Sequence, residues 1–244
     1  MSPPVFLVEA ARLRADRVRL DGPEGRHAAT VRRLTPGERV DLVDGAGLLA
    51  ECVVAAAGRD VLDVDVLVRR QLAPPAPRLV VVQALPKGER GELAVQTLTE
   101  VGVDVVVPWT AARCVTRWHG KRGAKGLARW RAAAREATKQ SRRAWLPDVR
   151  DPASTAEIAA LLRVAALAVV LREQGGEPLA TVDVPATGDV VVVVGPEGGV
   201  SPEELVAFTA AGASAYRLGP TVLRTSTAGV AALAVLSARS GRWT

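Results

Sequence analysis

The stretch Val190-Val-Val-Val-Val-Gly-Pro-Glu-Gly-Gly-Val-Ser-Pro-Glu-Glu-Leu205 decides the fold of the larger part of the chain. It opens on five consecutive valines, a pattern typical of a strand buried on both faces in a parallel sheet covered by helices. A glycine-rich loop follows, and then a helix start with Ser201 as N-cap, Pro202 as first helical residue and Glu204 completing a capping box. The stretch therefore predicts a strand, a loop and a helix in direct succession.

The loop Gly195-Pro-Glu-Gly-Gly199 is a candidate ligand site, because α/β proteins place ligands beyond the C-terminal ends of parallel strands. Its glycines allow positive φ angles and a close approach of the backbone to a ligand. A phosphate fits poorly, since no Lys-Ser/Thr pair follows the glycines and Glu197 would repel it. The loop by itself leaves two interpretations open: a site for a neutral or cationic ligand, and a tight turn that binds nothing.

Strands alternate with helices on both sides of this stretch, which predicts an α/β layer domain over residues 73–244. We expect its strands at Leu79–Val82, Val103–Val107, Ala165–Leu171, Val190–Val194 and Ala215–Leu218, and its helices near 89–101, 127–144, 201–211 and 225–239.

A proline-rich connector, Leu72-Ala-Pro-Pro-Ala-Pro-Arg78, precedes this domain and excludes helix and central strand. Before it the chain is β-rich, and Asp44-Gly45-Ala46-Gly47 is a strong hairpin turn. Residues 1–72 therefore predict a small β-barrel. Its expected strands are Val5–Val8, Arg39–Val43, Leu48–Val54 and Val61–Val68.

The composition is that of a soluble globular protein, with 48% hydrophobic and 24% charged residues and a formal net charge of +6. The charge fits either a polyanionic partner or a generally basic protein. Cys52 and Cys114 match no metal-ligand spacing, so we expect no metal and two buried thiols in a reducing compartment. No signal peptide and no apolar run of about 20 residues is evident, so we expect a cytoplasmic protein with no membrane partner.

Basic residues gather in a loop with Gly120, Gly123 and Gly126, and along the helix after it. Trp130, Ala134, Ala137, Ser141 and Ala144 can form the buried stripe of that helix and leave the basic side chains on its other faces. A second basic cluster, which includes Arg12, Arg14, Arg17, Arg19 and Arg32, lies in the first domain. The alternative for the helix is a solvated face of mixed charge, but only Glu136 interrupts its positive series, so we expect the basic surfaces to contact RNA. The candidate RNA-binding residues are Arg26, Arg33, Arg113, Arg117, Lys121, Arg122 and Arg142.

The segment from Tyr216 to Ala228 is a second strand end, loop and helix start. Arg224 is the only charged residue between Arg217 and Arg239, and an arginine alone in a neutral stretch favours a functional role over a solvating one. The two histidines carry less weight. We interpret His27 as structural and His119 as a phosphate contact or a bystander.

Together the two loop segments resemble the SPOUT (knotted) methyltransferases, and most closely the RsmE family of 16S ribosomal RNA uridine-N3 methyltransferases. Gly195–Gly199 matches the family's GPEGG loop, and Leu218–Ala228 matches its LGxxILRTETA segment, except that Ser226 stands where the family usually has Glu. Three further segments resemble the family in the same order along the chain. They are His27–Gly37, Lys87 with Glu100–Pro108, and Glu136–Arg142.

The resemblance implies a trefoil-knotted SPOUT domain over 73–244 that binds S-adenosyl-L-methionine (SAM) and forms a homodimer, preceded by a PUA-like RNA-binding barrel over 1–72. It implies 16S ribosomal RNA of the small subunit as substrate. Arg224 is our candidate catalytic residue, which would stabilise the developing uracil anion. The candidate SAM-binding residues are Leu171, Glu173, Gly195, Pro196, Glu197, Gly198, Gly199, Leu218, Gly219, Leu223 and Thr225.

Two alternatives remain open. One is a SPOUT enzyme that methylates the ribose 2′-hydroxyl, whose site must activate a hydroxyl group instead of a ring nitrogen. The other is a non-catalytic RNA-binding or ribosome-assembly protein, which Ser226 favours. A Rossmann-type methyltransferase is disfavoured, because the first strand of the α/β domain leads into Gln83–Gly88 with no G-x-G-x-x-G.

Overall fold

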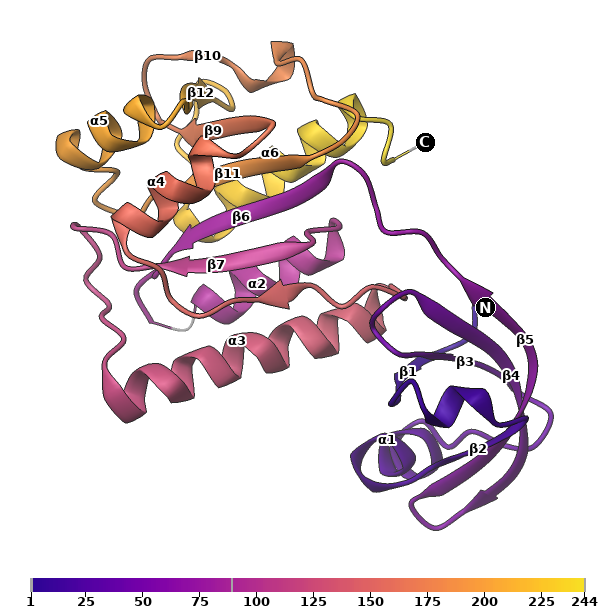
Figure 1. The fold of residues 1–244 in the computed structure, drawn as a ribbon. Helices are drawn as coiled ribbons and strands as arrows, with labels where there is room; N and C mark the ends of the chain where they lie inside the picture. Colours follow the sequence, from indigo (N-terminus) through magenta and orange to yellow (C-terminus); the bar gives the residue numbers. More distant parts are fainter. Residues whose placement is uncertain (1, 89, 244) are drawn as a thin grey trace. The chain divides into compact units, whose positions relative to one another are not determined.

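The computed structural model describes residues 2–88 and 90–243 and divides into two compact units (Figure 1). The first unit comprises the residues up to Pro74 together with Thr138–Leu146. The second comprises Pro75–Ala137 and the chain from Pro147 onward. Residues 72–77, between the last strand of the first unit and the first strand of the second, form neither helix nor strand, as the prolines predict.

The first unit is built on a five-stranded sheet with the order β1-β3-β4-β5-β2, in which β1 pairs parallel with β3 and the other pairs are antiparallel. Leu62 and Val64 are fully buried, so the alternating pattern of the strand that begins at Val61 correctly predicts which side chains face the core. The strands are β1 (Val5–Leu7), β2 (Arg17–Leu20), β3 (Arg39–Val43), β4 (Leu48–Gly58) and β5 (Val61–Gln71).

Strand β2 was not predicted from the sequence, because its outward-facing residues are arginines. Arg17 and Arg19 each form a two-bond ion pair with an aspartate on the neighbouring strand β5, Asp65 and Asp63 respectively. These guanidinium groups lower the pKa of both carboxyl groups. The cross-strand partner that makes Arg-Val-Arg-Leu a stable strand lies far away in sequence, where no local pattern reveals it.

A short helix α1 (Gly22–Arg26) continues into a π-helical turn, His27–Val31. The His27 ring packs edge-on against the buried ring of Phe6, with centroids 5.8 Å apart. The structural role predicted for His27 fits this contact.

The second unit is a seven-stranded sheet with the order β10-β12-β9-β11-β6-β7-β8, and every neighbouring pair is parallel. Val190 to Val194, in the centre of the sheet, are almost completely buried, as their composition predicts. The strands are β6 (Arg78–Ala84), β7 (Val105–Trp109), β8 (Asp148–Val149), β9 (Leu167–Leu171), β10 (Glu177–Pro178), β11 (Asp189–Val194) and β12 (Ser214–Arg217).

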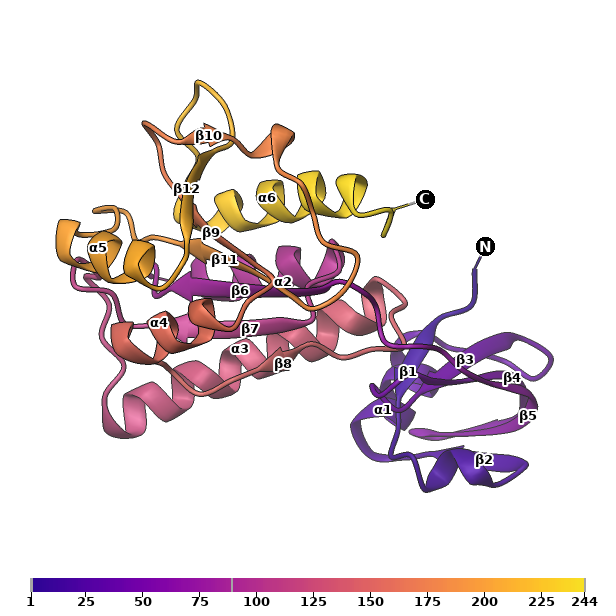
Figure 2. The same ribbon diagram turned by 45° about the horizontal axis from the view of Figure 1, so that its top comes forward.

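Helices cover the sheet on both faces. Figure 2 shows α4 and α5 packed together on one face, and α2 and α6 packed together on the other. The helices of this unit are α2 (Arg90–Glu100), α3 (Gly120–Gln140), α4 (Thr155–Arg163), α5 (Pro202–Ala210) and α6 (Thr225–Arg239). The predicted helix 89–101 includes Glu89, which lies outside the described residues. Helix α4 was not predicted, although Ser154 and Glu157 form a capping box at its start.

The predicted start of the helix at 127 is wrong, since α3 begins at Gly120. Gly123 and Gly126 suggested a loop in the sequence, but in the structure they let the helix pack closely against Trp118. A Cβ atom at Gly126 would lie 2.7 Å from the Trp118 ring, and one at Gly123 would lie 3.0 Å from the Trp118 backbone. Trp118 in turn packs edge-on against Trp130, with ring centroids 5.0 Å apart. Small residues are therefore required on this face of the helix.

The predicted end of the helix at 144 is also wrong, since α3 ends at Gln140 and Arg142 has a φ angle of 56°. The predicted buried stripe is confirmed for Trp130, Ala134, Ala137 and Ala144, and Ser141 is half-buried. The stripe thus continues beyond the helix itself.

The strand order reverses between β6 and β11. From β6 the chain moves outward to β7 and β8, whereas β9, β11 and β12 lie on the other side of β6. A reversal of this kind leaves a crevice at the C-terminal ends of the two central strands, where α/β proteins bind their ligands. The loop after β11 is the Gly195–Gly199 loop.

Candidate active site

A cavity of about 640 Å³ lies at the C-terminal ends of β9, β11 and β12. Because neighbouring strands are parallel, the loops that follow them converge on this edge of the sheet. The volume is within the range of small-molecule sites, roughly 300–1,000 Å³. The cavity brings together Arg224 and every residue predicted to bind SAM, namely Leu171, Glu173, Gly195, Pro196, Glu197, Gly198, Gly199, Leu218, Gly219, Leu223 and Thr225.

The glycine loop after β11 is compact because side chains would not fit in it. A Cβ atom at Gly195 would lie 3.0 Å from the Val200 side chain, and one at Gly198 would lie 3.2 Å from the Cβ of Arg113. Gly199 has a φ angle of 72°, which strains any residue with a side chain. At its glycines the loop therefore offers backbone groups to the cavity, while Pro196 and Glu197 also line it.

Two contacts hold this loop from neighbouring segments. The Glu197 carboxylate accepts a hydrogen bond of 3.0 Å from the backbone N–H of Lys87, in the loop after β6. The Arg113 guanidinium donates a hydrogen bond of 3.0 Å to the carbonyl of Gly198. Arg113, predicted to contact RNA, thus lies on the wall of the cavity.

Glu204, in the first turn of α5, is a buried carboxylate that joins three segments. One oxygen accepts from the backbone N–H of Ser201 at 2.9 Å, which is the predicted capping box. The other accepts from the backbone N–H of Ala112 at 2.6 Å, and Thr155 on α4 lies 3.5 Å away. The segment that carries Arg113 is thereby tied to the helix that follows the glycine loop.

Arg224 lies at the rim of the cavity as the N-cap residue of α6. Its carbonyl accepts hydrogen bonds of 2.9 Å from the N–H groups of Thr227 and Ala228, so its backbone position is fixed. Its side chain is exposed and makes no hydrogen bond or ion pair with any described residue. Ser226, which stands where the family usually has Glu, is 4% exposed and does not line the cavity.

A family described as RNA methyltransferase domain matches residues 74–237, and one described as RNA methyltransferase PUA domain matches residues 20–67. Ribosomal RNA small subunit methyltransferase E of Mycobacterium bovis is 50% identical over 228 residues, which cover 92% of this chain and 87% of that protein. The chain belongs to the ribosomal RNA small subunit methyltransferase E family. The resemblance found in the two loop segments is therefore confirmed.

More distant members of the methyltransferase E family are similar over the same span. The Bacillus subtilis protein is 29% identical, with 89% of this chain and 88% of that protein covered. The crystal structure of the Neisseria gonorrhoeae enzyme bound to S-adenosyl methionine superimposes with a TM-score of 0.87 at 27% identity, and both chains are covered completely. The predicted fold class, an α/β parallel-sheet domain preceded by a PUA-like β domain, is confirmed.

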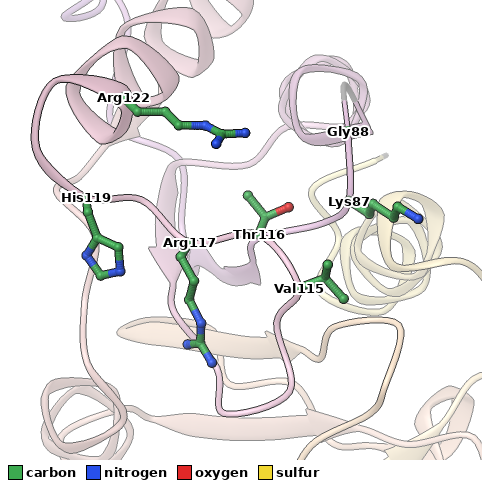
Figure 3. Close-up of a pocket in the computed structure, with 7 residues that line it drawn as sticks. All are labelled: Lys87, Gly88, Val115, Thr116, Arg117, His119 and Arg122. Atoms are coloured by element: carbon green, nitrogen blue, oxygen red, sulfur yellow. The ribbon is translucent and has the colours of Figure 1, made fainter.

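The predicted RNA-binding residues of this methyltransferase E chain are divided between the two units, with Arg26, Arg33 and Arg142 in the first and the others in the second. Arg117 donates hydrogen bonds to the carbonyls of Ala111 and Ala112, at 3.0 and 2.8 Å, so it serves the structure of its own loop. Arg122 is exposed and lines a second cavity, shown in Figure 3. Lys121, predicted in a loop, lies in the first turn of α3 instead.

Several basic residues of the two sequence clusters are neutralised by acids. Lys139 is only 7% exposed and pairs with Glu24, so it does not belong to an exposed basic face of α3. Arg12 pairs with Asp21, much as Arg17 and Arg19 pair with aspartates of β5. In the first unit, exposed arginines without an ion-pair partner among the described residues include Arg14, Arg26, Arg32 and Arg33.

The cavity also contains residues that sequence reasoning missed. Arg90 at the start of α2, and Arg172 and Gln174 after β9, line it alongside the predicted residues. Arg90 could have been predicted from the sequence, because β6 ends at the same edge of the sheet and the segment after it must therefore lie near the cavity. No described helix has the length and apolar character needed to cross a membrane, and no described His, Cys, Asp or Glu residues cluster as metal ligands.

Proposed function

We propose that this chain transfers a methyl group from SAM to N3 of a uridine in the 16S ribosomal RNA of the small ribosomal subunit. The observation that carries the proposal is that one cavity, at the C-terminal ends of β9, β11 and β12, is lined by both the GPEGG loop and the Leu218–Thr225 loop. The name of the relatives and the SAM-bound Neisseria structure support it.

The chemistry of the cavity fits SAM, which combines an adenine ring, a ribose, a cationic sulfonium and an amino acid group. Val194, Leu218 and Leu223 supply an apolar surface for the adenine, and the loop backbones supply hydrogen-bond donors and acceptors. Glu173 and Glu197 are carboxylates suited to hydroxyl groups and to positive charge. The same Glu197 disfavours a phosphate ligand.

SAM supplies an electrophilic methyl group when it is bound. For transfer, the uracil N3 must lose its proton and point its lone pair at that methyl group, so the contribution of the protein is orientation and charge stabilisation. Arg224 is suited to the second task, because its backbone is fixed by two hydrogen bonds while its guanidinium has no partner among the described residues. We propose that it faces the negative charge that develops on the uracil.

The remaining assignments concern partners. We infer that residues 1–72 bind RNA through exposed arginines such as Arg26 and Arg33, and that residues 73–244 bind SAM and form a homodimer. A trefoil knot in this second domain is supported by the strand order, since β11 inserts between β6 and β9 before the chain returns outside β9 as β12. A ribosomal substrate supports the inference that the protein works in the cytoplasm. Size-exclusion chromatography with light scattering tests the dimer, and a monomeric mass would contradict it.

Calorimetric titration with SAM and transfer of a labelled methyl group to unmethylated small subunits test the function. We expect both binding and transfer in the wild type. In Arg224→Ala we expect unchanged SAM affinity and a fall in kcat of about 100-fold or more, the typical effect of removing one oxyanion-type donor. Arg224→Lys keeps the charge and should recover part of the rate. SAM binding without methyl transfer by the wild type would overturn the proposal, as would wild-type kcat in Arg224→Ala.

A further inference from the structure

The second cavity, of about 460 Å³, lies next to the SAM cavity at the end of β6 (Figure 3). Lys87 lines this second cavity. Its backbone N–H also donates a hydrogen bond to Glu197, which lines the SAM cavity, so the two cavities are connected by this bond. The other walls come from the segment after β7, with Arg117 and His119, and from the first turn of α3, with Arg122.

The walls of this cavity are held in place by hydrogen bonds. The Thr116 hydroxyl donates to the carbonyl of Pro86 at 2.9 Å and fastens the segment after β7 to the loop after β6. Arg117 is fixed by its two bonds to backbone carbonyls. The Trp118 ring anchors the start of α3 through its packing against Gly126. The cavity therefore belongs to a built framework whose three segments are connected to one another.

The charge in this cavity is entirely positive among its described lining residues, which include no carboxylate. The side chains of Lys87, His119 and Arg122 make no hydrogen bond or ion pair with a described residue, so their donors are available to a ligand. Figure 3 shows Arg122 reaching from α3 toward Thr116, with His119 and Arg117 on the neighbouring wall; Lys87 lies on the opposite rim, and its side chain points away from the other three. The N-terminus of α3 has no acidic residue in its first turn and adds positive potential.

We propose that this cavity binds an internucleotide phosphate of the substrate RNA beside the target uridine, with Arg122 as its principal donor. The inference rests on the proposed function and adds a subsite to it. A guanidinium can bind two phosphate oxygens at once, and a phosphate is small enough for a pocket of this size. The adjacent SAM cavity would receive the base of the nucleotide whose phosphate is held here. Each half of one nucleotide then has its own site.

The test compares methyl transfer to unmethylated small subunits by the wild type, Arg122→Ala, Arg122→Lys and the control Lys125→Ala. Lys125 is exposed on the same helix, one turn further along, and does not line the cavity. For Arg122→Ala we expect KM for the subunit to rise about 10-fold with unchanged kcat and SAM affinity. The slope of log(kcat/KM) against log salt should fall by about 0.7–0.9, the value for one lost phosphate contact. Lys125→Ala should match the wild type.

Arg122→Lys should keep the salt slope and show a smaller rise in KM, because it retains the charge and loses the two-oxygen contact. A KM within about twofold of wild type in Arg122→Ala, or an equal effect in Lys125→Ala, would overturn the phosphate subsite. Loss of SAM affinity in Arg122→Ala would also overturn it, since the residue would then support the SAM cavity. If the wild type transfers no methyl group, the proposed function fails, and subunit binding by sedimentation in the same salt series decides on the subsite separately.

Discussion

Replacement of Glu204 by alanine removes the carboxylate that ties together three segments next to the proposed SAM cavity, which lies at the ends of β9, β11 and β12. Glu204 is 5% exposed and accepts backbone hydrogen bonds from Ser201 and Ala112. In the alanine variant both N–H groups lose their acceptor inside the protein. In Glu204→Gln the amide oxygen can still accept one of the two bonds, while its NH2 group cannot accept the other.

A hydrogen bond to a charged group contributes about 1.5–3 kcal/mol, so two such bonds set the expected loss near 3–6 kcal/mol for Glu204→Ala. The glutamine variant should lose about half as much. For a chain of this size each kcal/mol shifts Tm by about 2–4 °C, which gives a decrease of about 10 °C for the alanine variant. Glu203, its exposed neighbour in the same helical turn, carries the same charge without the contact to Ala112. Glu203→Ala should therefore lower Tm much less than Glu204→Ala does.

Differential scanning calorimetry of the three variants and the wild type measures this series, and a titration with SAM follows on each protein. We expect the order wild type, Glu203→Ala, Glu204→Gln, Glu204→Ala in decreasing Tm, and weaker SAM binding in Glu204→Ala because the segment carrying Arg113 is released. Equal Tm values for the two alanine variants would refute the reasoning, since the bond to Ala112 would then contribute nothing.

Packing at Gly126, burial of Cys52 and charge at Arg242 can each be tested by substitution or modification. Gly126→Ala should lower Tm despite the better helix propensity of alanine, because its Cβ atom would lie 2.7 Å from the Trp118 ring; a raised Tm would contradict the packing. Burial raises the pKa of Cys52 to about 12, so its thiolate fraction at pH 8 is only about 10⁻⁴. A thiol reagent should therefore modify this residue only after unfolding in urea, and rapid reaction of the native protein would disprove its burial. Arg242→Ala should cost about 3–5 kcal/mol in urea denaturation, because it leaves the 10% exposed Asp104 carboxylate without its guanidinium; recovery in the double variant with Asp104→Asn checks the cause.

Local patterns in the sequence predict much of the second unit. The five valines of β11 and the capping box at Ser201 are properties of neighbouring residues, and both are found as predicted. These two predictions need only the order of residues and the geometry of strands and helices. The grouping of the two loops into one ligand site came from the family resemblance, and the structure has both loops on one cavity because parallel strands end at the same edge of a sheet.

The parts that could not be predicted depend on partners distant in sequence. Glycines at the start of α3 look like loop residues until Trp118 is seen to pack against them. Arginines in the first unit look like an RNA-binding surface until aspartates across the sheet are seen to neutralise Arg17 and Arg19. Lys139 is buried for the same kind of reason, through Glu24. Charge counted along a sequence therefore overestimates the charge that a surface offers to RNA.

The central claim, methylation of uridine at N3, is tested most directly by mass spectrometry of the nucleosides released from small subunits after reaction with the protein and labelled SAM. We expect the label to be recovered as a uridine methylated on its base at N3. Label in a ribose 2′-O-methyl nucleoside would contradict the choice of atom and favour the ribose-methylating alternative. Recovery of no labelled nucleoside, with SAM bound, would contradict the assignment of Arg224 and its cavity to catalysis.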